Sequence, residues 1–210
     1  MNILIPDCIE KNLLMKGYIK LRKRAWDILE SELSDRLLYH DISHTKDVLR
    51  VCNQYIRRQG ISGYNAKLLR LAALLHDIGF TVAYADHEEK SVEIATQLMR
   101  ECGFHKADIS VVSGLIMATK IPQQPKTKLE KIICDSDLDY LGRKDFYPIS
   151  RRLYKEFLAF SIVSNEQEWN QVQLKFLETH TYHTSFAREN RQPVKEQHLK
   201  VIKSMVSLPT

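Results

Sequence analysis

The chain has 210 residues, of which 44% are hydrophobic and 27% are charged, and this balance is typical of one ordinary globular domain. No apolar run approaches the roughly 18 residues of a transmembrane helix, and a secretory signal is not expected at the N-terminus. The four cysteines form no Cys-x-x-Cys pair, which favours reduced thiols and a cytoplasmic protein over a disulfide framework or a zinc finger. A net charge of +5 suits a phosphorylated substrate but is too small to indicate specific nucleic-acid binding or a membrane partner.

The sequence predicts an all-α fold in a single domain. There are only 7 glycines and 6 prolines, no alternating β pattern and no repeat, and helical periodicity recurs throughout. Residues 18–210 are expected to form this domain, and residues 1–17 an N-terminal arm that packs on its own domain or on a neighbour in a homodimer. Helices are predicted at 18–33, 44–58, 65–78, 87–101, 108–119, 127–141, 146–161, 165–178 and 193–207.

The helix predicted at 44–58 places a histidine on its apolar face. At about 100° per residue, His44 aligns with Val48, Val51 and Tyr55. A lone histidine in such a position is usually a hydrogen-bonded core residue, so His44 gains meaning only from what it faces. His40 precedes this helix and is expected to be a surface or capping residue.

The next helix ends in the segment LAALLHDIGF, residues 71–80. This helix is apolar nearly all round, so it is expected in the middle of the fold, with Gly79 placed to end it. His76 and Asp77 then lie in its last turn, where the negative end of the helix dipole favours a cation. Because an acid is poorly placed at that end, Asp77 needs a further partner, and a metal ion is the simplest one.

The predicted helix at 127–141 carries three aspartates. Asp137 falls on the apolar stripe between Ile133 and Leu141, whereas Asp135 and Asp139 lie on the opposite side and are expected to be solvated. A buried carboxylate requires a charged partner or a proton. Asp137 is therefore expected to share the interior with the residues of the two preceding helices.

Two imidazoles and two carboxylates thus face one interior, and they satisfy one another only around positive charge. Such a set suits a divalent ion with open positions for water, and the residue types do not choose among Mn, Fe, Co, Ni, Zn and Mg. The alternative is a salt-bridged core network in a purely structural scaffold. That alternative is less favoured, because buried ionic networks often cost more free energy than they return.

The order of these residues resembles the HD-domain superfamily of metal-dependent phosphohydrolases, in particular a bacterial group of phosphodiesterase-like members. The similarity covers roughly residues 36–205 and rests on YHDISHT (39–45), AALLHDIGF (72–80), CDSDLDYLG (134–142), HEEKS (87–91), ATKIPQQP (118–125) and FLETHTYHTSFA (176–187). The resemblance implies an HD-type helical bundle with the metal ligands His44, His76, Asp77 and Asp137. It also implies that a metal-activated water attacks a phosphomonoester or phosphodiester, with Asp77 as both ligand and catalytic residue.

His87 is the second candidate catalytic residue. It aligns with Ser91, Ile94 and Leu98 on an apolar face. Some HD proteins hold a second metal ion here through two histidines, but this sequence has Thr119 at the second position, so that site is incomplete. His87 is expected to orient water or to protonate the leaving oxygen; a second metal ion near His87, or a pairing of His87 with Asp86 or Glu88, are the alternatives.

Three residues are candidate substrate contacts: Lys120, which could instead complement a helix dipole, and His180 and Arg188, which match family positions. The leading hypothesis is hydrolysis of a small phosphorylated molecule such as a nucleotide. The alternative is a non-catalytic sensor that binds a metal ion and a nucleotide and signals to a partner.

Overall fold

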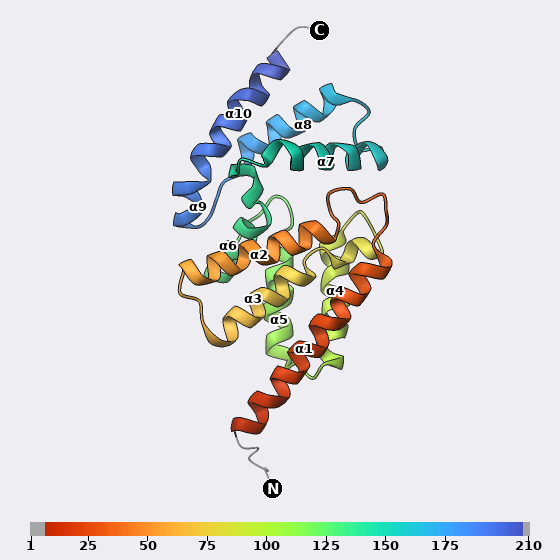
Figure 1. Cartoon of the computed structure of the whole chain (residues 1–210), viewed down its shortest axis with the longest axis vertical. Coiled ribbons are helices and arrows are strands. Elements are labelled where there is room, and N and C mark those ends of the chain that lie inside the picture. The colour runs from red at the N-terminus through yellow and green to blue at the C-terminus, as the bar shows by residue number, and fades with distance from the viewer. Residues whose placement is uncertain (1–6, 208–210) are drawn as a thin grey trace.

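In a computed structural model of the chain, the backbone is described for residues 7–207 and the side chains for residues 16–207. Within this range the chain forms α-helices and two 3-10 turns and no β-strand, which confirms the predicted all-α class (Figure 1). The elements are α1 (Asp7–Glu32), α2 (Ile42–Arg58), α3 (Gly63–Leu75), η1 (Ile78–Thr81), α4 (His87–Glu101), α5 (Lys106–Ala118), α6 (Lys128–Asp137), η2 (Asp139–Gly142), α7 (Phe146–Ala159), α8 (Glu166–Thr179), α9 (Ser185–Asn190) and α10 (Gln192–Ser207).

Several predicted boundaries differ from the structure by a few residues, such as the helix predicted at 65–78, which is α3 (Gly63–Leu75), and three further differences change the set of elements. The first helix begins at Asp7 and not near residue 18, so it includes much of the predicted arm; residues 1–6 lie outside the described range, and how the arm packs stays a prediction. The helix predicted at 127–141 divides into α6 and η2. The short helix α9 was not predicted; its N-cap is Thr184, whose side chain accepts a hydrogen bond from the Ala187 amide.

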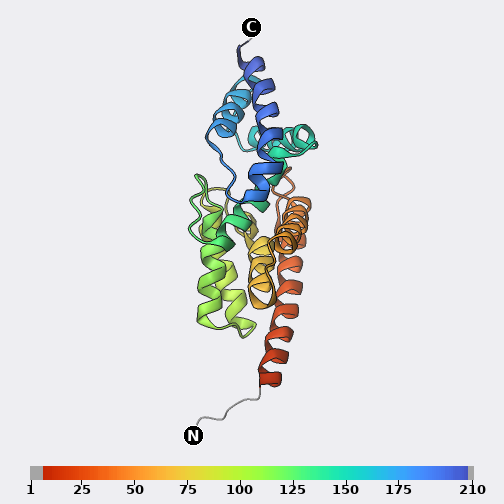
Figure 2. The same cartoon turned by 90° about the vertical axis from the view of Figure 1, so that its left-hand side faces the viewer.

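The helices form two groups along the long axis of the molecule (Figures 1 and 2). The larger group holds α1 to α6, in which α2 packs on α3 and α6, and α5 packs on α3 and α4. The smaller group holds α7 to α10, in which α8 packs on α10. Because α10 also contacts η2, the two groups meet at the end of the segment that carries Asp137.

Helix α3 is the most deeply buried part of the larger group, as its all-round apolar sequence predicts. Its leucines and alanines at positions 68, 69 and 71–75 are each at most 3% exposed. They pack against apolar residues of α2, α5 and α6 in one core cluster. This core holds the carboxyl end of α3, and with it His76 and Asp77, in the interior.

Gly79 has a different role from the predicted one. Helix α3 ends at Leu75, and Gly79 lies inside the turn η1. Its amide donates a hydrogen bond to the Ser91 hydroxyl over 2.8 Å. A Cβ atom on Gly79 would overlap the carbonyl oxygen of His87 and approach the Ser91 nitrogen. The glycine is therefore required so that η1 can lie directly against the first turn of α4.

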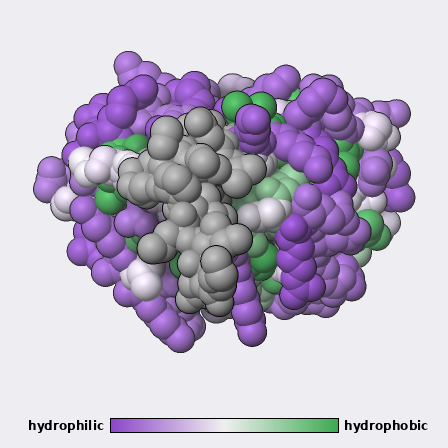
Figure 3. Space-filling view, turned by 90° about the horizontal axis from the view of Figure 1, so that it is seen from below, coloured by the Kyte–Doolittle hydropathy of each residue, from purple (hydrophilic) through white to green (hydrophobic). Residues whose placement is uncertain are grey.

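The end of the molecule at which α1 begins is mostly polar (Figure 3). Seen from the end of the long axis that holds the N-terminus, hydrophilic residues dominate and the visible hydrophobic ones are scattered between them (Figure 3). No helix within the described range is long and apolar enough to span a membrane.

Candidate metal centre and its cavity

Three separate segments deliver four side chains to one point. His44 lies in the first turn of α2, which Asp41 caps by accepting hydrogen bonds from the amides of Ser43 and His44. His76 and Asp77 follow α3 directly, and Asp137 is the last residue of α6. The metal-ligand set expected from the sequence is thus brought together at the ends of these helices.

The contacts among these four side chains are close. The Nε2 atom of His44 lies 3.3 Å from His76 Nε2, 3.3 Å from Asp77 Oδ2 and 3.3 Å from Asp137 Oδ1. The Nε2 atom of His76 lies 3.2 Å from Asp77 Oδ2 and 3.5 Å from Asp137 Oδ1. The potential ligand atoms of His44, His76 and Asp77 all lie within 4.8 Å of one another, and Asp137 completes the set through both imidazoles.

The chemistry of this donor set fits a divalent cation. His76 Nδ1 lies 3.1 Å from the Ala73 carbonyl oxygen, to which it can only donate, so the neutral ring presents a lone pair at Nε2. Asp77 Oδ2 is buried and has no hydrogen-bond partner. Acceptor atoms therefore face each other with nothing positive between them, a situation that a metal ion resolves.

Without a metal ion, protons have to supply the missing charge. Burial alone would lower the pKa of His44, but the carboxylates of Asp137 and Asp77 outweigh it and raise that pKa to about 9. The same carboxylates raise the pKa of His76 against its burial. Burial likewise opposes ionisation of Asp137, yet the two imidazoles lower its pKa to about 2. Because a metal ion binds the deprotonated ligands, it would displace the imidazole protons.

Asp77 also connects this cluster to His87. Its second oxygen, Oδ1, lies 3.6 Å from His87 Nε2, which is also 3.5 Å from Glu88 Oε1. The ring of His87 stacks on Phe80 with a centroid distance of 3.9 Å. Thr119 is buried, and its hydroxyl donates to the Ile116 carbonyl over 2.7 Å. His87 therefore borders the metal centre without belonging to the cluster of four.

The interpretation of Asp135 and Asp139 as solvated residues was wrong. Asp135 is fully buried, and it accepts hydrogen bonds from the amides of His183 and Thr184. Asp139 is also buried; it accepts hydrogen bonds from the Tyr55 hydroxyl and the Arg191 guanidinium. The side of α6 and η2 that is polar on a helical wheel is covered by the C-terminal segment, whose amides hydrogen-bond Asp135 and whose Arg191 pairs with Asp139.

His40 was also misjudged as a surface or capping residue. It is partly buried and lines a cavity beside the metal centre. Its ring pairs with the carboxylate of Glu156 from α7, which also accepts hydrogen bonds from the amides of Tyr39 and His40. The sequence holds a signal for this position only in the motif YHD, because the partner is 116 residues away.

The three candidate substrate contacts lie apart from the cluster. The ammonium of Lys120 pairs with the carboxylates of Asp86 and Glu89. The guanidinium of Arg188 donates to the Tyr182 carbonyl over 3.0 Å. His180 is buried next to Lys195, and burial with that lysine lowers its pKa to about 3. In the structure these residues hold neighbouring segments together, and a role in substrate binding stays a prediction.

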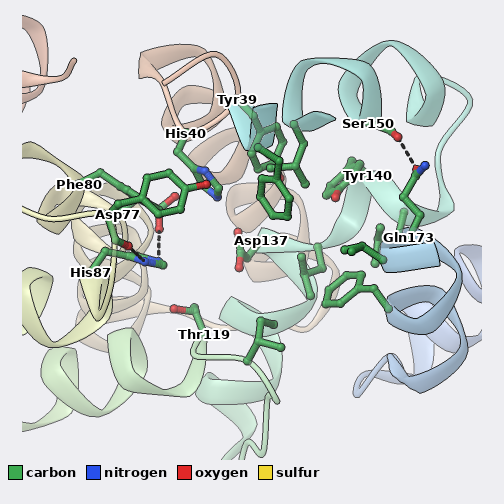
Figure 4. Close-up of a pocket in the computed structure, with 18 of the residues that line it drawn as sticks. Tyr39, His40, Asp77, Phe80, His87, Thr119, Asp137, Tyr140, Ser150 and Gln173 are labelled. Atoms are coloured by element: carbon green, nitrogen blue, oxygen red, sulfur yellow. Dashed lines mark hydrogen bonds and ion pairs between the residues drawn. The ribbon is translucent and has the colours of Figure 1, made fainter. Parts of the chain in front are cut away.

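A cavity of about 410 Å³ opens from the metal centre toward α7 and α8. Asp77 and His87 lie at one end, Ser150 and Gln173 lie at the other, and Asp137 lies between them (Figure 4). Much of its wall comes from apolar residues of the α7–α8 pair, for which no sequence motif predicts a site: Leu153, Phe157, Trp169, Val172, Phe176 and Leu177. Helical periodicity could place them on one face of each helix but could not show that this face borders a metal centre.

Comparison with known proteins agrees with this geometry. The HD domain family matches residues 38–139, which include all four residues of the cluster. An uncharacterized protein of Clostridium beijerinckii is 26% identical over 114 residues, which are 53% of this chain and 68% of that protein. A crystal structure of a predicted HD superfamily hydrolase from an uncultured Thermotogales bacterium is 22% identical. The structural match covers 88% of this chain and 91% of the Thermotogales chain, with a TM-score of 0.58. Residues 38–139, just under half of the chain, thus match the HD domain family, and the overall fold is similar to that of a predicted HD superfamily hydrolase.

Proposed function

We propose that this protein is a metal-dependent phosphohydrolase that cleaves a phosphoester of a small molecule. The observation that carries the proposal is the cluster of His44, His76, Asp77 and Asp137, whose facing acceptor atoms call for a divalent cation beside a cavity of substrate size. The match of residues 38–139 to the HD domain family supports the same reaction class. Three finer points stay predictions: that the substrate is a nucleotide, whether the ester is a phosphodiester or a phosphomonoester, and that the protein is cytoplasmic.

The four ligands would hold the ion, which when bound lowers the pKa of a water molecule and offsets charge on the phosphoryl oxygens. Asp77 would ligate through Oδ2, and its Oδ1 atom is then free to accept a hydrogen bond from the attacking water. In the reaction a bond forms from the water oxygen to phosphorus and the bond from phosphorus to the ester oxygen breaks. His87, 3.6 Å from Asp77 Oδ1, is placed to give a proton to the departing oxygen.

The direct test is metal content together with turnover. Protein purified without chelator or affinity metal is analysed for bound elements, then incubated with each divalent metal and a panel of phosphomonoesters and phosphodiesters. We expect near-stoichiometric metal and phosphate or alcohol release. The Asp137→Ala variant is expected to stay mostly folded while it loses metal and activity. Asp35→Ala, which removes an exposed carboxylate after α1, is the matched control and should retain both.

Two outcomes would contradict the proposal. If the four residues form only a structural core network, the parent protein would bind no metal and the Asp137→Ala variant would be destabilised. A non-catalytic sensor would bind metal and a nucleotide tightly and release no product over hours. The complete ligand set argues against the sensor, because a degenerate binder need not retain all four residues.

A further inference from the structure

The cavity beside the metal centre has an unusual division of polarity. The ionisable groups that line it all lie in the segments around the metal centre. They are the side chains of His40, Asp77, His87, Glu88 and Asp137 and the phenols of Tyr39, Tyr84 and Tyr140. The part built by α7 and α8 is formed by aliphatic and aromatic side chains, with Ser150 and Gln173 as its polar pair. One end is therefore suited to phosphate chemistry and the other to an apolar group.

The polar pair at the far end is already partly satisfied. The Ser150 hydroxyl donates to Gln173 Oε1, and Gln173 Nε2 donates to Asn170 over 3.3 Å. Both side chains are at least 92% buried, since their exposed fractions are 7% and 8%. What remains for a ligand is one amide N–H and one oxygen lone pair of Gln173, together with the lone pairs of Ser150. A ligand with many polar groups at this end would leave most of them without partners.

The cavity also lacks the cations that a polyphosphate would need. Among the described residues that line it, none is a lysine or an arginine. The arginines on the other side of Asp137, Arg143 and Arg152, line an adjoining recess of about 230 Å³, which shares Tyr39, Asp137 and Tyr140 with the cavity. Both are paired, Arg143 with Asp47 and Asp145, and Arg152 with Asp41. One phosphoryl group at the metal centre is therefore the charge that this site can accommodate.

The open side of the cavity is apolar as well. Its most exposed large hydrophobic lining residues are Ile121, in the loop before α6, and Val172 of α8, which are 50% and 40% exposed. Trp169 lines the wall near Val172 and packs edge-on against Phe157. An apolar group entering between Ile121 and Val172 would meet the aromatic and aliphatic side chains of α7 and α8.

Resting on the proposed function, we infer that the substrate is a phosphate ester of a compact, uncharged and mainly apolar alcohol. The ester phosphate lies at His44, His76, Asp77 and Asp137, and the ring or branched hydrocarbon of the alcohol fills the space between α7 and α8. Sugar phosphates, nucleotides and polyphosphates are poor substrates, because their polar groups find too few partners. This inference therefore replaces the nucleotide substrate that the sequence predicts. Each buried methylene of the alcohol strengthens binding by about fourfold.

The test compares esters of primary alcohols, so that the leaving groups have similar reactivity. They are 2-cyclohexylethyl, 2-phenylethyl and glycerol 1-phosphates and nucleoside 5′-monophosphates, each also offered as the methyl diester. We expect kcat/KM for the two apolar esters to exceed the others by about 100-fold or more. Equal or faster turnover of the glycerol or nucleoside esters would overturn the inference while leaving the phosphohydrolase proposal intact.

A second measurement works without turnover. In the Trp26→Phe protein, Trp169 is the remaining tryptophan, and its fluorescence should change saturably on titration with 2-cyclohexylethanol. Val172→Glu should weaken this binding, and lower kcat/KM for the cyclohexylethyl ester, by at least tenfold. Gln171→Glu adds the same charge at the adjacent exposed position and should change neither.

Absence of saturable binding would overturn the inference whatever the activity. Binding of the alcohol without hydrolysis of any ester would instead support the apolar site and count against the phosphohydrolase proposal.

Discussion

Glu156 of α7 holds His40 at the edge of the metal-centre cavity. The buried carboxylate of Glu156 pairs with the His40 ring and accepts hydrogen bonds from the amides of Tyr39 and His40 and from the Tyr84 hydroxyl. This contact joins the group of α7–α10 to the loop that leads into α2. It therefore fixes how the apolar half of the cavity meets the metal centre.

Glu156→Gln should destabilise the protein by about 3 kcal/mol at neutral pH, because hydrogen bonds to a buried charge are replaced by weaker ones. Burial opposes the ionisation of Glu156, but His40 and the two amides lower its pKa below the usual value. A lowered folded-state pKa gives stability that is present above pH about 4.5 and is lost as pH falls through the folded-state value. Urea unfolding from pH 3 to pH 7 should show the two proteins converging at low pH. Glu166→Gln, at an exposed glutamate of α8, should follow the parent protein throughout.

Asp139→Asn should cost about 3 to 5 kcal/mol of stability, because Arg191 would lose its buried charged partner. The metal content of the protein that remains folded should be unchanged. Asp137→Ala should show the opposite pattern, with metal lost and most stability of the metal-free protein kept. Chemical unfolding and elemental analysis of both variants separate the two roles. Loss of metal from folded Asp139→Asn would show that Asp139 supports the metal centre directly.

Gly79→Ala should lower the free energy of unfolding by roughly 1 to 3 kcal/mol, because the added methyl group has to push η1 away from α4. The displacement would also move Asp77 relative to His87, so activity should fall further than stability explains. Gly114→Ala is the matched control: a Cβ atom there meets nothing within 4 Å in α5. It should stabilise the protein by about 0.5 to 1 kcal/mol through helix propensity. Equal effects of the two substitutions in thermal unfolding would refute the close-approach explanation.

His87→Gln should reduce kcat by roughly 10²- to 10⁴-fold, the usual contribution of a general acid. Bound metal per chain should not change, because His87 lies outside the cluster of four. Single-turnover kinetics and elemental analysis on the same preparations provide both readouts. A drop in metal stoichiometry would favour the alternative in which His87 ligates a second ion, and an unchanged kcat would remove His87 from the reaction.

The sequence by itself determined the fold class and the identity of the central cluster. The helical positions of His44, His76 and Asp137 relative to their apolar neighbours are set within each helix. The local sequence is therefore enough to show that each of them faces the core. The helix predicted at 87–101 has the same bounds as α4, because the signals that begin and end it are also local. Gly79 was noticed from sequence, but its close approach to His87 depends on a second helix.

Only the tertiary structure decided the environment of the remaining residues. Asp135 and Asp139 have the phase of solvated residues, and they are buried because α9 and the segment before it fold back over them. His40 depends on Glu156, and the apolar wall of the cavity depends on α7 and α8 lying across from the metal centre. These are contacts between segments that are far apart in the chain. A helical pattern specifies which face of a helix is apolar, whereas the packing of whole helices specifies what that face encloses.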